Sequence, residues 1–123
     1  MKFFILAASF AALVSANTKN FSGSCSNIRI FNGRDRPEVL QATCNTLDGS
    51  TAEAELQLVL CLGAVDGKLQ YQDRGFFIES CSDCALSGGT TVYTCNCGGD
   101  TLTAIDLNTV VGNENGKLAC GPP

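Results

Sequence analysis

The sequence predicts an all-β domain with pseudo-twofold symmetry, built from two tandem repeats and cross-linked by disulfides. A hairpin motif occurs twice: residues 62–69 and 111–118 each run from an apolar residue and glycine, through Asp-Gly or Asn-Gly, to Lys-Leu. Asp-Gly and Asn-Gly between apolar residues are strong hairpin signals, because a type I′ turn needs positive φ at both central positions. Polar and apolar residues alternate in Glu53–Leu58 and Lys68–Gln72, as in half-buried strands.

Residues 1–16 have the features of a secretory signal peptide. Lys2 precedes an apolar run that ends at Val14, and Val14-Ser15-Ala16 is a small-residue cleavage site. The alternative is a membrane anchor, which needs about 20 apolar residues, and the run is too short for that. We therefore expect a secreted protein with one domain over residues 17–123.

Composition excludes several classes of function. The chain has no histidine, which removes the commonest general base and the commonest metal ligand. Its net charge is −4, with the charges scattered along the chain and no basic stripe. We therefore expect neither nucleic acid nor an anionic membrane as a partner. One motif stands apart from this pattern: Asn20-Phe21-Ser22 is an N-glycosylation acceptor, which predicts a surface position.

The chain starts again near its middle. Phe77-Ile78-Glu79-Ser80-Cys81 repeats the pattern of Phe21-Ser22-Gly23-Ser24-Cys25, and the strand and turn features that follow recur in the same order. Repeat one spans about 21–72 and repeat two about 77–123, with an additional loop in the first. A repeat of about 50 residues with short strands cannot easily bury a core alone, so the two copies should form one body.

The eight cysteines predict a disulfide framework, because their number is even and they follow a secretion signal. Cys25 and Cys44 bracket the first predicted hairpin of repeat one, and Cys81 and Cys95 bracket its counterpart in repeat two. The repeat therefore predicts Cys25–Cys44 and Cys81–Cys95.

For the four remaining cysteines we favour a local bridge, Cys84–Cys97, and a bridge across the body, Cys61–Cys120. The pair Cys81–Cys97 with Cys84–Cys95 remains open. The C-x-x-C and C-x-C spacing of residues 81–97 would also suit zinc. We rank zinc below disulfides, because the other four cysteines would still need partners.

The recurring Phe-x-x-Ser-Cys motif and the run Ile105–Val111 leading into Asn113–Leu118 resemble the cyanovirin-N homology (CVNH) family. The resemblance covers essentially the whole chain after residue 16. It implies a domain in which the three-stranded sheet of one repeat packs with the β-hairpin of the other. It also implies non-catalytic binding of oligosaccharides or glycoproteins, typically at mannose-rich ends, with no cofactor and no metal.

By this resemblance, each pocket is formed by the segment before the first cysteine of a repeat, residues after its second cysteine, and the turn of the opposing hairpin. The first site then comprises Asn20, Gly23, Ser24, Asn45, Leu47, Asn113, Glu114, Asn115 and Gly116. The second comprises Ala64, Val65, Asp66, Gly67, Glu79, Ser80 and Asn96. A glycan on Asn20 would lie at the edge of the first site.

Departures from the family pattern predict that the second site is weak or absent. Gly63-Ala64 stands where the pattern has polar contact residues, and Cys97 where it has a hydroxyl. The first site keeps polar groups at its turn, although Leu47 replaces a polar residue. The hinge Gln72–Gly75 lacks the proline associated with strand-exchanged dimers in the family, so we expect a monomer, with domain swapping as the alternative.

Two other classes compete with a lectin. Glu53 and Glu55 are paired carboxylates of the kind that glycosidases use, but on a strand they face the same solvent side. The second rival is a secreted structural or protein-interaction module that keeps the scaffold without sugar binding. For a lectin, exchange of Asn113 and Asn115 for alanine should abolish glycan binding and leave melting unchanged.

Overall fold

The computed structural model of the chain describes residues 19–99 and 102–123. The predicted signal peptide, residues 1–16, lies outside this part. Repeat one forms five strands and two 3-10 turns: η1 (Phe21–Gly23), β1 (Cys25–Phe31), β2 (Val39–Asn45), β3 (Thr51–Gln57), η2 (Leu58–Leu60), β4 (Leu62–Val65) and β5 (Lys68–Tyr71). Repeat two forms the same series: η3 (Phe77–Glu79), β6 (Ser82–Leu86), β7 (Val92–Asn96), β8 (Thr103–Asp106), η4 (Leu107–Thr109), β9 (Val111–Glu114) and β10 (Lys117–Cys120).

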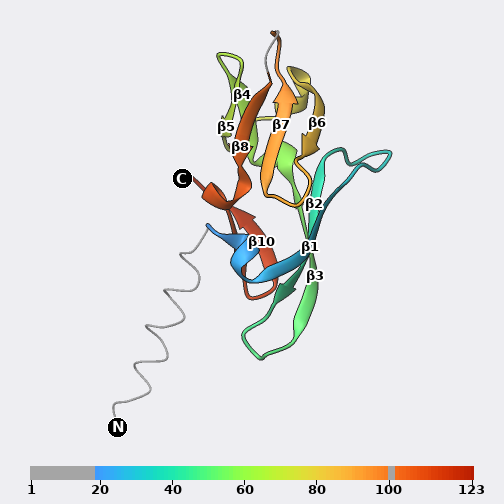
Figure 1. Cartoon of the computed structure of the whole chain (residues 1–123), viewed down its shortest axis with the longest axis vertical. Coiled ribbons are helices and arrows are strands. Elements are labelled where there is room, and N and C mark those ends of the chain that lie inside the picture. The colour runs from blue at the N-terminus through green and yellow to red at the C-terminus, as the bar shows by residue number, and fades with distance from the viewer. Residues whose placement is uncertain (1–18, 100–101) are drawn as a thin grey trace.

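Each repeat contributes a three-stranded sheet and a separate hairpin. The sheets have the strand orders β1-β2-β3 and β6-β7-β8, and the hairpins are β4-β5 and β9-β10. Figure 1 shows hairpin β4-β5 beside β8, while β10 lies with β1 and β3 at the other end of the molecule. Each hairpin therefore packs on the sheet of the other repeat, which confirms the predicted all-β, pseudo-symmetric fold. Among the described residues, no helix has the length and apolar character needed to cross a membrane.

The two predicted hairpin turns are present. Asp66 and Gly67 have φ of 53° and 78°, and Asn115 and Gly116 have φ of 53° and 89°. Positive φ at both central positions defines the type I′ turn, whose twist matches that of the flanking strands. The Asp-Gly and Asn-Gly pairs thus fix the register of both hairpins.

One hydrophobic core serves both repeats. The aromatic residues that open the two repeats, Phe21 and Phe77, are both buried, as is Tyr93 from the centre of β7. The Phe77 and Tyr93 rings meet edge to face with centroids 5.8 Å apart. The Tyr93 hydroxyl donates a hydrogen bond to the Glu38 carboxylate of repeat one. Burial first, and then this hydrogen bond, raises the pKa of Tyr93, so the phenol stays protonated and joins the repeats at neutral pH.

Strand register explains the disulfides. In repeat one Cys25 pairs with Cys44, whereas in repeat two Ser82 pairs with Asn96, which places Cys81 opposite Cys97. Cys97 is therefore the structural counterpart of Cys44, two residues further along the chain than the prediction had placed it. A bulge residue with φ of 54° follows in β1 and in β6, so the equivalence extends beyond the cysteines.

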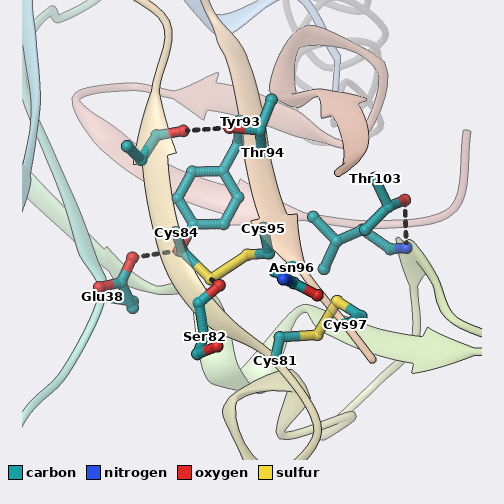
Figure 2. The surroundings of a disulfide bond; sticks show 12 residues. Glu38, Cys81, Ser82, Cys84, Tyr93, Thr94, Cys95, Asn96, Cys97 and Thr103 are labelled. Atoms are coloured by element: carbon teal, nitrogen blue, oxygen red, sulfur yellow. Dashed lines mark hydrogen bonds between the residues drawn. A yellow bond between two sulfur atoms is a disulfide. The ribbon is translucent and has the colours of Figure 1, made fainter. Parts of the chain in front are cut away.

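The structure contains Cys25–Cys44 and Cys61–Cys120, as predicted. The predicted Cys81–Cys95 and Cys84–Cys97 are wrong, because the bridges are Cys81–Cys97 and Cys84–Cys95, the alternative left open above. Figure 2 shows these two bridges side by side near Tyr93. With all four thiols of residues 81–97 in disulfides, the zinc alternative is excluded.

The bridge Cys84–Cys95 has no counterpart in repeat one, where the pairing places Ile28 and Ala42 at the equivalent positions. A variant with Cys84→Ile and Cys95→Ala therefore copies the packing of repeat one. In the chain-entropy model, loss of the Cys84–Cys95 bridge lowers the free energy of unfolding by about 3 kcal/mol, because this bridge spans only 11 residues. Loss of Cys61–Cys120, which spans 59 residues, should cost about 4 kcal/mol.

Denaturant unfolding compares the free energy of unfolding of two oxidised double variants. One has Cys84→Ile with Cys95→Ala, and the other has Cys61→Ala with Cys120→Ala. A larger loss for the Cys84–Cys95 variant would contradict the predicted order. Peptide mapping under non-reducing conditions checks that the remaining bridges are unchanged.

Candidate functional site

The first predicted site lies where hairpin β9-β10 meets the sheet of repeat one. Asn113 on β9 donates from Nδ2 to the Ser24 hydroxyl and to the Asn45 carbonyl, both at 2.9 Å. Its Oδ1 accepts a hydrogen bond of 2.8 Å from the backbone N–H of Gly116. One side-chain amide therefore holds the hairpin turn in shape and ties it to the other repeat.

The tip of the hairpin packs against the β2–β3 loop. Asn115 Oδ1 accepts a hydrogen bond of 2.8 Å from the backbone N–H of Leu47. Gly116 is buried, and a Cβ added there would lie 2.8 Å from the Thr46 methyl carbon. Glycine is thus required at this position both for its φ and for the close approach of the loop.

The β2–β3 loop is held by the carboxylate of Asp48. This carboxylate accepts hydrogen bonds from the Thr46 hydroxyl and from the hydroxyl and backbone N–H of Ser50. These bonds, with Thr46 first, lower the pKa of Asp48 to about 2, because they favour the ionised carboxylate. The loop that faces the hairpin is therefore fixed by its own side chains.

The structure brings the nine predicted residues of the first site together. The Gly23 N–H donates to the Asn20 carbonyl at 3.0 Å. The Asn45 N–H donates to the Ser24 carbonyl at 2.9 Å. The surface offers exposed Asn20, Asn45 and Asn115 and the half-buried carboxylate of Glu114. Amide and carboxylate groups of this kind can donate to and accept from sugar hydroxyls.

Asn113 has a different role from the one the sequence suggested. Its amide is already engaged with Ser24, Asn45 and Gly116, so it positions the site rather than presenting a free polar group. The expectation that replacing Asn113 leaves melting unchanged therefore does not fit these contacts.

The second predicted site is only partly assembled. Asp66 and Gly67, at the turn of hairpin β4-β5, line a hollow of about 410 Å³ against repeat two. The five other predicted residues, Ala64, Val65, Glu79, Ser80 and Asn96, do not line it. Its other lining residues are Lys68, Cys97, Gly98, Gly99, Leu102, Thr103 and Ala104.

Strand register accounts for this difference. Asn96 pairs with Ser82 as Thr43 pairs with Ser26, so the counterpart of Asn45 is Gly98 rather than Asn96. A hydrogen bond of 3.0 Å, from the Leu69 N–H to the Thr103 hydroxyl, ties the hairpin to repeat two here (Figure 2). The position of Cys97 in repeat two points to these lining residues. Strand pairing is needed to recognise Cys97 as the counterpart of Cys44.

A larger hollow, about 850 Å³, contains none of the predicted site residues. It lies between the edge strands β1 and β6 and is lined by both repeats, including Ile28 and Arg29 of β1 and Leu86 of β6. No sequence motif predicted this hollow, because it forms only where the edges of the two sheets approach each other.

The paired carboxylates of β3 do not form a catalytic pair. Glu53 accepts hydrogen bonds from Thr43 and Arg29, and Glu55 from Arg36 and Gln41. These bonds lower both pKa values, chiefly through Thr43 for Glu53 and through Arg36 for Glu55. The general acid of a glycosidase needs a raised pKa, so the electrostatics oppose that role. Among residues 19–99 and 102–123, no cluster of metal-ligating side chains is found.

A domain in which each hairpin packs on the sheet of the opposite repeat, with a polar contact where hairpin β9-β10 meets repeat one, is typical of a class of lectin-like folds. The family model of the CVNH domain matches residues 21–119, so the chain belongs to the CVNH family. Proteins of this family are carbohydrate-binding lectins and not enzymes.

Solved structures of CVNH proteins match most of the chain. TbCVNH of T. borchii is 28% identical with a TM-score of 0.67, over 83% of this chain and 99% of that one. GzCVNH of Gibberella zeae is 26% identical with a TM-score of 0.66, over 82% and 96%. Microvirin, solved as a complex with mannobiose, is 34% identical with a TM-score of 0.63, over 84% and 99%. No curated protein matches the chain significantly.

The contacts of Asn113 predict that Asn113→Ala destabilises the fold. The variant leaves Ser24, Asn45 and Gly116 without their amide partner, and at about 1 kcal/mol for each hydrogen bond the loss is about 2–3 kcal/mol. Denaturant unfolding measures it. The control is Asn45→Ala, which keeps the Asn45 backbone carbonyl and should change stability little; equal midpoints for the two variants would contradict the prediction.

The loop contacts predict an unusually acidic carboxyl group. Asp48 should titrate near pH 2, where carbon-detected NMR follows its carboxyl carbon. Because the pKa of Asp48 is lower in the folded state than the ordinary carboxyl value of 3.8, the loop contacts stabilise the fold above pH 3.8 and are lost as the pH falls toward 2. Thr46→Ala should move the midpoint toward 3.8, and a midpoint that does not move would contradict the assignment.

Proposed function

We propose that this protein is a secreted, non-catalytic lectin that binds mannose-type oligosaccharides, mainly through the first site. The observation that carries the proposal is the polar surface built by Asn113, which locks the hairpin turn against Ser24 and Asn45. Rigid binding groups lose little conformational freedom when a ligand binds, so a site held in this way favours affinity. Microvirin, 34% identical, was solved with mannobiose, which supports a mannose-type ligand.

The two sites should differ because the two hairpins differ. Ala64 occupies the position of Asn113 in the second hairpin, so no side-chain amide there can bridge to repeat two. Cys97 lies in the bridge to Cys81 and offers no free thiol or hydroxyl. The second hollow therefore has fewer polar side chains to present to a sugar, and we assign it weak binding or none.

Secretion is supported by the four disulfides, which persist in oxidising compartments. We also propose a monomer. The backbone at Gly75, in the hinge, lies so close to Gly63 that a Cβ there would be 2.6 Å from the Gly63 nitrogen. This packing stabilises the closed hinge, in which the hairpin β4-β5 stays within its own chain.

A matched pair of turn variants tests the assignment of the first site. Asn115→Gly and Asp66→Gly alter equivalent positions, both with φ of 53°, where glycine is accommodated without strain. Asn115→Gly also removes the side chain that holds Leu47, and should weaken mannobiose binding about tenfold or more, or about 1.4 kcal/mol. Asp66→Gly should leave the main binding event unchanged.

Isothermal titration of the oxidised protein with mannobiose gives affinity and stoichiometry for each variant. Saturable binding near one site per chain supports the proposal. Absence of binding would favour the structural or protein-interaction alternative, and an equal loss in both variants would refute the assignment to the first site.

A further inference from the structure

We propose that Asn20 carries an N-linked glycan and that this glycan covers the first site, so that its presence decides whether the site is open to external ligands. The covering effect rests on the proposed function, whereas the modification itself does not. Asn20-Phe21-Ser22 is the only Asn-x-Ser/Thr motif in the sequence. The acceptor and the predicted binding surface therefore coincide at one place on the molecule.

The acceptor side chain is exposed and is not used by the fold as a cap. Asn20 precedes η1 with φ of 62° and ψ of 39°, and its side chain makes no capping hydrogen bond to the turn. Phe21, the middle residue of the motif, is buried in the core. The motif thus lies at the surface, with the Asn20 amide exposed and the Phe21 ring buried. Attaching a sugar to this amide costs the turn no capping bond.

The direction of the amide places the glycan beside the binding surface. Asn20 Nδ2 lies 3.0 Å from the position that a Cβ would take at Gly23, a residue of the first site. Gly23 is followed by Ser24, whose hydroxyl accepts a hydrogen bond from Asn113. Because Gly23 has no side chain, the first sugar of a glycan on Asn20 starts next to this surface with no side chain between them.

The attachment point is rigid. The Asn20 backbone N–H donates to the carbonyl of Asn108 at 2.7 Å, and its carbonyl accepts from Gly23 at 3.0 Å. Asn108 in turn holds the Ser22 backbone and hydroxyl through its side-chain amide. The glycan base is thus fixed on both sides, and the sugars attached to it have a high effective concentration around the first site.

The chemistry is a group transfer that a secreted chain meets in the secretory pathway of a eukaryotic cell. A bond forms between Asn20 Nδ2 and the anomeric carbon of the reducing-end N-acetylglucosamine. The bond between that carbon and the diphosphate of a lipid-linked oligosaccharide donor breaks, and the lipid diphosphate leaves as the amide loses one proton. No oxidant or reductant is needed.

The first experiment measures the modification. The full chain is expressed in a eukaryotic secretory host, and the intact mass of the secreted protein is recorded before and after peptide N-glycosidase, which converts a glycosylated asparagine to aspartate. The native chain and Ser22→Thr, which keeps the motif, should lose a glycan mass on digestion. Asn20→Gln and Asn20→Asp should carry none. A native chain without glycan mass overturns the proposal, whatever its binding activity.

The second experiment measures the covering effect with mannobiose as the probe. Titrations compare the glycosylated chain with Ser22→Ala, which removes the acceptor motif and keeps the Asn20 side chain, and with the digested chain, which carries aspartate at position 20. Ser22→Ala should bind about tenfold or more tightly than the glycosylated chain, a difference of about 1.4 kcal/mol. Equal affinities of Ser22→Ala and the glycosylated chain overturn the covering role. Absence of binding in Ser22→Ala overturns the proposed function and the covering role with it, while the mass measurement still decides the modification.

Discussion

Neither repeat of this protein buries its own sheet, and the rest of the structure depends on that constraint. Each hairpin crosses to the sheet of the other repeat, and the buried side chains of both halves form one core that includes Phe21, Phe77 and Tyr93. Polar contacts reinforce the exchange, with Tyr93 bound to Glu38 at the centre and Asn113 bound to Ser24 at one end. A repeat of this size gains its core only by sharing it.

The same exchange creates the surface that we propose binds sugar. Where hairpin β9-β10 meets repeat one, the contact is polar and specific, because one amide satisfies three partners. Where hairpin β4-β5 meets repeat two, alanine takes the place of that amide and the counterpart of Asn45 is a glycine. The two hairpin contacts of the duplicated scaffold therefore differ in a few side chains rather than in the backbone.

Most of the fold follows from local patterns in the sequence. The two Asp-Gly and Asn-Gly turns, the recurring Phe-x-x-Ser-Cys motif and the even number of cysteines specify two hairpins, two repeats and a disulfide framework. Of the four bridges, Cys25–Cys44 follows from position in the repeat, and Cys61–Cys120 is the bridge favoured across the body. The pairing of the other two does not follow in this way, because counting cysteines along the chain ignores which residues the strands place opposite each other.

By itself the sequence determined the turns and the duplication, since each depends on residues near one another in the chain or on a recurring motif. Only the tertiary structure decided the roles of individual residues. In the structure Asn113 connects the hairpin to repeat one, the counterpart of Asn45 is Gly98, and a hollow lies between β1 and β6. These features depend on strand register and on the docking of segments distant in sequence, which no local pattern encodes.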